Sequence, residues 1–150
     1  MIKSDITVEI DPFFISYNNE YLPLSPQGEP KPMDDIPDYL LFNLLGCIQP
    51  IITGEIYSFH FIDGPDILII IPWGEETTII FQTANIENFK SDNSITVPTI
   101  ELLYGIMQNA KNILDNKEWE YIFDDGREKL LLRYDRLKEF LFNHGCHGIS

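Results

Sequence analysis

The sequence predicts an α+β fold, with a mainly antiparallel sheet of about five or six strands and two or three helices packed on it. The main support is residues 51–82, where short apolar or alternating segments are separated by turn signals. Such segments, bounded by Gly, Pro and Asp, are typical of strands joined by tight turns. Other parts of the chain carry leucines at helical spacing. A length of 150 residues suits one domain, so we expect a single α+β domain over residues 1–150.

The N-terminal part predicts two strands. Ile6–Ile10 alternates apolar and polar residues, Asp11-Pro12 breaks this strand, and Phe13–Tyr17 resumes an extended pattern. Asn18, Asn19 and Glu20 read as a turn. The two segments form either a hairpin or one strand bent at Pro12.

Residues 23–37 contain five prolines, which predicts an irregular connection because each proline fixes φ and removes a backbone donor. It is either a surface connection or a binding loop. A first helix should follow, with Asp34-Asp35 at its N-cap and Pro37 in its first turn. Its apolar face comprises Leu40, Leu41, Leu44, Leu45 and Ile48. Gly46 should weaken this helix, and Pro50 should end it.

Residues 51–82 predict three antiparallel strands, one within 51–62, one over Ile67–Ile71 and one over Thr77–Gln82. We expect them to form the centre of the sheet and the floor of the core. Residues 83–94 are polar and predict an exposed connection. A second helix should start around Thr96-Val97-Pro98, with Glu101 favourable in its first turn.

The C-terminal third leaves two interpretations. Lys117–Phe123 alternates and predicts a strand, and Asp124-Asp125-Gly126 predicts a turn. Residues 127–142 carry leucines at helical spacing, which favours one long helix capped by Asp125. The alternative is a hairpin through Asp125-Gly126, followed by a strand over Lys129–Tyr134 and a short helix from Asp135.

The balance of 24 Asp+Glu against 10 Lys+Arg gives a net charge of −14. This charge disfavours direct nucleic-acid binding and anionic membrane surfaces, and it favours a basic protein partner. Ile67–Ile71 is the longest apolar run and is too short to span a bilayer. The first five residues lack the pattern of a signal peptide, and two cysteines, Cys47 and Cys146, make no disulfide framework. These features predict a cytoplasmic protein.

The sequence contains no recognisable catalytic set, so we expect no enzyme, cofactor or metal. There is no Gly-x-Ser-x-Gly stretch and no glycine-rich phosphate loop before a helix. Cys47 sits among helical leucines and reads as a buried hydrophobe. The one competing signal is the soft-ligand cluster of His144, Cys146 and His147 near the C-terminus, which would need a fourth ligand to hold zinc.

Charge is unevenly distributed along the chain. No Lys or Arg occurs between Lys31 and Lys90, whereas five of the ten cations fall within residues 127–138. Trp73 lies on a predicted turn beside Glu75-Glu76, an arrangement that suits an interface anchor with an acidic rim. The solvated acidic surface that merely improves solubility is the competing interpretation. The residues predicted to bind a partner are Asp34, Asp35, Asp38, Trp73, Glu75 and Glu76.

A small, acidic, cysteine-poor α+β chain with Asp34-Asp35, Glu75-Glu76 and Asp124-Asp125 on predicted loops resembles bacterial immunity proteins of polymorphic toxin systems. The resemblance implies tight binding of a cognate toxin domain, often a nuclease, whose cationic active site the carboxylates would cover. Three alternatives remain. They are an acidic antagonist that mimics nucleic acid, a small enzyme or metal protein that uses the C-terminal His/Cys cluster, and a scaffold with an exposed apolar face.

Overall fold

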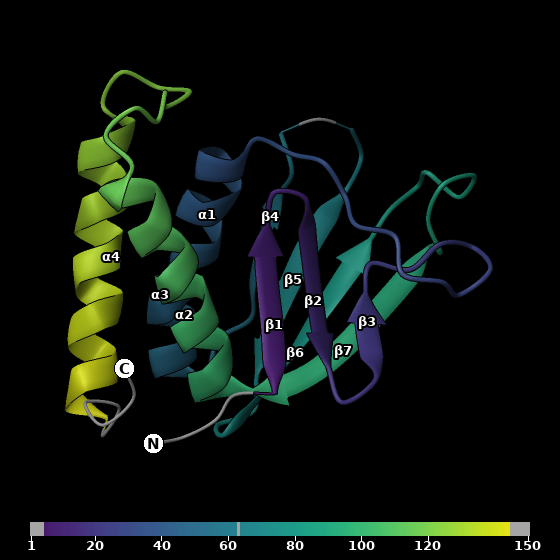
Figure 1. Cartoon of the computed structure of the whole chain (residues 1–150). Helices are drawn as coiled ribbons and strands as arrows, with labels where there is room; N and C mark the ends of the chain where they lie inside the picture. Colours follow the sequence, from purple (N-terminus) through teal and green to yellow (C-terminus); the bar gives the residue numbers. More distant parts are fainter. Residues whose placement is uncertain (1–4, 63, 145–150) are drawn as a thin grey trace.

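The computed structural model describes residues 5–62 and 64–144 as seven strands and four helices (Figure 1). The strands are β1 (Ile6–Ile10), β2 (Phe13–Tyr17), β3 (Glu20–Leu22), β4 (Tyr57–His60), β5 (Ile67–Pro72), β6 (Glu76–Gln82) and β7 (Asp92–Pro98). The helices are α1 (Pro37–Leu45), α2 (Ile48–Thr53), α3 (Thr99–Asp115) and α4 (Gly126–Asn143). None of these helices is long and apolar enough to cross a bilayer.

The strands form two antiparallel sheets, one with the order β1-β2-β3 and the other with the order β4-β5-β6-β7. The predicted α+β class and antiparallel pairing are therefore confirmed, and the predicted strand number was slightly too low. Strand β3 escaped prediction because it has only three residues, too few for a periodic pattern. It follows a two-residue turn in which Asn18 and Asn19 have φ of 52° and 68°, a conformation that asparagine tolerates.

Strand β7 occupies residues that the sequence assigned to a connection and to a helix start. Asp92–Pro98 pairs with Gln82–Glu76 at every position, and Ile95 and Val97 point into the core. Helix α3 begins at Thr99, with Pro98 as its N-cap. The sequence predicted a connection here because the residues on the outward face of the strand, among them Ser94 and Thr96, are polar.

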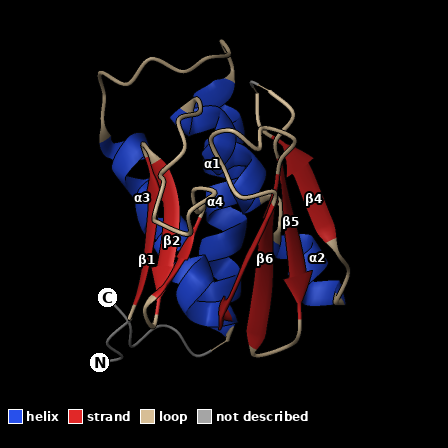
Figure 2. Cartoon of the chain, turned by 90° about the vertical axis from the view of Figure 1, so that its right-hand side faces the viewer, coloured by secondary structure: helices blue, strands red, loops and turns tan. Residues whose placement is uncertain are grey.

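The two sheets face each other across the core, and the helices fill the open side between them (Figures 1 and 2). Strands β3 and β7 contact each other where the sheets converge, and the Leu24 amide donates to the Asn93 side chain at 3.0 Å. The inward residues are fully buried and include Phe13, Ile15, Leu40, Leu44, Leu68, Ile70, Ile79 and Phe81. The free edge of β1 is covered by α3, whose Asn109 side chain donates to the Val8 carbonyl at 2.8 Å.

The first predicted helix is two helices, and three details of its prediction were wrong. The N-cap residue is Ile36, not Asp34 or Asp35, and no side chain caps it. The break falls at Gly46 and Cys47, and Pro50 lies in the first turn of α2, where its missing N–H is no loss. Gly46 closes α1 because its backbone N–H bonds to the Asn43 carbonyl, at 3.0 Å.

The expected strand over Lys117–Phe123 does not form, since these residues make the irregular connection from α3 to α4. No neighbouring strand is available there, because both sheets lie away from this end of the helices (Figure 1). Gly126–Asn143 is one helix, as preferred, and the alternative hairpin is excluded. Asp125 holds the N-cap position without a side-chain cap bond, and its carboxylate pairs with Lys129 at 3.2 Å.

Candidate functional site

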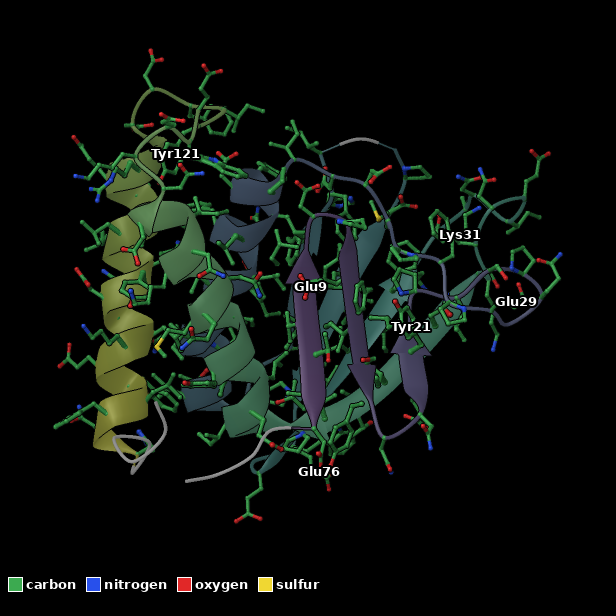
Figure 3. The ribbon with its side chains drawn as sticks, viewed as in Figure 1. Glu9, Tyr21, Glu29, Lys31, Glu76 and Tyr121 are labelled. Carbon is green, nitrogen blue, oxygen red and sulfur yellow. The ribbon has the colours of Figure 1, made fainter. Side chains whose placement is uncertain are left out.

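The six residues predicted to bind a partner fall into two groups at opposite ends of β5. Trp73 and Glu75 lie on the turn after β5, and Glu76 is the first residue of β6. Asp34, Asp35 and Asp38 lie at the start of α1, which is tied to the other end of β5 because the Tyr39 hydroxyl donates to the carbonyl of His60, the partner of Ile67. The six residues of β5 span about 20 Å. In Figure 3, Glu76 and Tyr121, which belongs to the α3–α4 connection, lie at opposite ends of the molecule.

The group at α1 does not present a shared surface. Asp34 is exposed and Asp35 is partly buried, but Asp38 is only 6% exposed. The Asp38 carboxylate accepts a hydrogen bond of 3.0 Å from the Ile122 amide, which holds the α3–α4 connection against α1. This contact gives Asp38 a structural role, and a partner would meet little of its side chain.

The turn between β5 and β6 is held firmly by the start of α3. The Trp73 amide donates to the Glu76 carbonyl at 2.7 Å, and Gly74 sits between them with φ of 84°, which favours glycine. Thr99 then donates twice to the tip, from its amide to the Glu75 carbonyl at 2.8 Å and from its hydroxyl to the Gly74 carbonyl at 2.9 Å. The position of Trp73, Glu75 and Glu76 is therefore set before any partner arrives.

Trp73 is 65% exposed and yet fixed in orientation. Its indole nitrogen donates to the Thr78 hydroxyl at 2.8 Å, and that hydroxyl also lies 2.8 Å from the hydroxyl of Thr96. Both threonines are on the outward face of their strands, so the indole lies at the end of the outer face of the four-stranded sheet. A held, solvent-facing tryptophan is the residue type most often found as an interface anchor.

The outer face of this sheet is lined with isoleucine. Strand alternation sends Leu68 and Ile70 inward and leaves Ile67, Ile69 and Ile71 outward and partly exposed. Ile80 joins them from β6, directly opposite Ile69. The helices α1, α3 and α4 and the three-stranded sheet lie on the other side of the four-stranded sheet (Figures 1 and 2), and α2 contacts β5. The four isoleucines remain partly exposed. We call these four isoleucines, which lie beside Trp73, the isoleucine face.

Small polar residues and carboxylates surround the isoleucine face. Ser58 and Ser94 pair with Ile69 and Ile80 on the flanking strands. At the end that carries Trp73 lie the exposed residues Glu55, Ile56, Glu75 and Glu76. Ile56, which is 68% exposed, precedes β4 at the end that β4 shares with Trp73, because Tyr57 pairs with Ile70. An apolar centre with a polar and acidic rim has the composition of a protein-binding surface.

The fold separates the charges in space. None of the seven strands contains Lys or Arg, whereas α4 alone carries five cations. The Lys111–Asp115 and Lys129–Asp125 ion pairs lie on α3 and at the start of α4, so they neutralise no carboxylate of the sheets. Of the acidic middle expected from the sequence, Glu75 and Glu76 lie at the four-stranded sheet, and Asp34, Asp35 and Asp38 lie at the start of α1. Helix α4 carries five of the ten cations together with three carboxylates.

The alternative of an enzyme or metal protein finds little support among the described residues. Cys47 is fully buried, and this burial raises the pKa of its thiol to about 12, so it is a poor nucleophile. Across residues 5–62 and 64–144 no group of three or more His, Cys, Asp or Glu side chains is placed to hold a metal ion. Cys146 and His147 of the predicted soft-ligand cluster lie outside the described residues.

Sequence reasoning identified Trp73, Glu75 and Glu76 but missed the isoleucine face. Residues 51–82 were predicted to form the centre of the sheet and the floor of the core, a prediction that does not distinguish the two faces of Ile67–Ile71. The sequence feature that could have indicated this face is the Ser and Thr content of the flanking strands, which makes the outward face polar at its margins. No family model, curated protein or solved structure matches this chain.

Proposed function

We propose that this chain is a cytosolic binding protein that neutralises a basic protein partner, in the manner of the immunity proteins of polymorphic toxin systems. The observation that carries the proposal is the exposed indole of Trp73, held on a rigid turn between the isoleucine face and the carboxylates of Glu75 and Glu76. The partner would bring an apolar contact surface with cationic residues around it.

The proposed mechanism is occlusion. The isoleucine face and Trp73 would supply the apolar area that keeps the complex together, because burial of apolar surface is the main favourable term in association. The surplus of carboxylates on the sheets would attract a basic partner and accelerate encounter. If the partner is a nuclease-like toxin, the carboxylates would lie against the cations that otherwise bind phosphate.

The test is co-expression with the protein encoded immediately upstream, followed by measurement of the association and dissociation rates of the purified pair at low and high salt. A stoichiometric complex weakened by Trp73→Ala supports the proposal. A complex that tolerates Trp73→Ala and isoleucine-face substitutions such as Ile69→Thr would contradict it. The nucleic-acid-mimic alternative predicts inhibition of a DNA-binding protein that depends on carboxylates and is indifferent to Trp73.

A further inference from the structure

A second exposed surface lies on the three-stranded sheet, away from the isoleucine face. Phe14 on β2 and Tyr21 on β3 point outward, with ring centroids 5.0 Å apart and planes within 14° of parallel. Glu9 on β1 stands directly opposite Phe14 in the strand register. Figure 3 shows Glu9 and Tyr21 on the two outer strands, with β2 between them. Phe14 and Tyr21 therefore form a stacked ring pair, which we call the platform, with the Glu9 carboxylate at its β1 margin.

An open cavity of about 590 Å³ continues this platform toward the β2–β3 turn. Ser16 and Tyr21 belong to both, since Ser16 pairs with Tyr21 across the strands and both line the cavity. The rest of the lining includes Asp5, Glu20 and Tyr17, and the described lining residues contain no Lys, Arg or His. Within the described lining, carboxylates and tyrosines therefore surround the opening without a cationic side chain.

Aromatic rings beside carboxylates favour the binding of a planar cation. Aromatic faces attract cations through the ring quadrupole, and guanidinium stacks on rings while its N–H groups form paired bonds to carboxylates. An ammonium lacks that planar fork. The negative environment is also felt by Tyr21, whose pKa is raised by burial and, secondarily, by the charge of Glu9.

We propose that the platform of Phe14 and Tyr21, together with the cavity carboxylates Asp5 and Glu20, binds an arginine side chain of a protein partner. The guanidinium would stack on Tyr21 and donate to the cavity carboxylates. The β2–β3 turn lies at the same end of the molecule as the turn that carries Trp73 (Figures 1 and 2). A single basic partner could touch both surfaces, but this proposal does not depend on the isoleucine face.

The experiment is a titration of the full chain with N-acetyl-L-arginine amide, followed by backbone amide NMR shifts. We expect saturable shifts centred on Phe14, Ser16, Glu20 and Tyr21. N-acetyl-L-citrulline amide has nearly the same shape without the charge and should bind at least tenfold more weakly. N-acetyl-L-lysine amide should bind about two- to fivefold more weakly, since it cannot stack as a planar fork. Free L-arginine should also bind more weakly, because its own carboxylate meets Asp5 and Glu20.

Two variants locate the site. Glu20→Gln should weaken the arginine probe about two- to fivefold, as expected for one exposed ion pair, and Tyr21→Val should weaken it by a similar factor. Glu118→Gln, an exposed carboxylate at the opposite end, is the matched control and should change nothing. The proposal is overturned if citrulline amide binds equally well, if the shifts scatter over many carboxylates, or if Glu20→Gln has no effect. Equal or tighter binding of free arginine would overturn the assignment to a protein side chain. Because the probe is small, failure here leaves the proposed role of Trp73 untouched.

Discussion

The carboxylate of Asp38 accepts a hydrogen bond from the backbone amide of Ile122, 84 residues away along the chain. Asp38 belongs to the first turn of α1, and Ile122 to the connection between α3 and α4. One buried side chain therefore holds the irregular connection that contains Lys117–Phe123 against α1.

Replacing Asp38 with Ala should lower the free energy of unfolding by about 1.5–3 kcal/mol, because the Ile122 amide would lose a charged acceptor. Asp38→Asn keeps an acceptor oxygen and should lose less. Urea unfolding measures both. Affinity for a partner should be unchanged in the folded fraction, and a variant that keeps its stability but loses binding would return Asp38 to the binding surface.

Trp73→Ala should weaken partner binding by about 2 kcal/mol or more, roughly thirtyfold, because an exposed aromatic held in one orientation suits the anchor of an interface. Stability should change little, since the ring is 65% exposed. Dissociation rates report the effect. Trp73→Phe keeps an aromatic ring but loses the hydrogen bond to Thr78, so its dissociation rate should lie between those of the unmodified protein and Trp73→Ala. An unchanged dissociation rate in Trp73→Ala would remove this residue from the interface.

Reversing both Glu75 and Glu76 to Lys should slow association with a basic partner about tenfold at low salt, with a much smaller effect at 0.5 M salt, where screening is strong. The matched control is the double reversal of Glu118 and Glu120, which are equally exposed but lie at the other end of the molecule. Equal slowing by both pairs would show that net charge alone acts, without a preferred surface.

Cys47 should make stability fall in alkaline solution. Burial raises the pKa of its thiol from 9.0 to about 12, so the unfolded chain releases this proton first as pH rises. The contribution is complete below pH 9 and is lost between pH 9 and about 12. The unfolding free energy of Cys47→Ala should therefore decline less steeply over this interval than that of Cys146→Ala, and parallel curves would contradict the buried state of the thiol.

Gly46→Ala should destabilise the protein by about 1–3 kcal/mol. An added methyl group would overlap the Tyr57 hydroxyl and the Arg133 guanidinium, which donate to the carbonyls of Asn43 and Phe42 at the end of α1. The Tyr57 and Arg133 hydrogen bonds cannot both be kept once the methyl group is added. Tyr57→Phe removes one obstacle, so the double variant should lose less than the sum of the two single changes in thermal or urea unfolding.

Much of the secondary structure could be read from local pattern. The strands β1, β2, β5 and β6 were predicted from alternation or from short apolar runs between turn signals, and the helices α3 and α4 from apolar residues at a period of 3.6. Strand β3 is too short for a period, and α1 and α2 were merged because their shared apolar face conceals the break at Gly46. A strand was predicted over Lys117–Phe123 but does not form, since alternation cannot reveal whether a neighbouring strand exists to pair with the segment.

The candidate site was partly predictable for the same reason. Trp73, Glu75 and Glu76 were chosen from their position on a turn, and they do lie together and exposed. Asp38 was chosen because it is acidic and near a helix start, but its burial depends on a segment 84 residues later in the chain. The platform of Phe14 and Tyr21 was not visible at all, because the two rings meet only through strand pairing.

The sequence by itself determined the α+β class, most of the elements and the separation of charge between an acidic middle and a cationic last helix, since these follow from local periodicity and composition. Tertiary structure alone decided which face of β5 is covered, where the two sheets converge and which carboxylates are buried. Those outcomes depend on contacts between distant segments. Burial of one sheet face leaves the other to solvent, and no local pattern in Ile67–Ile71 distinguishes the two.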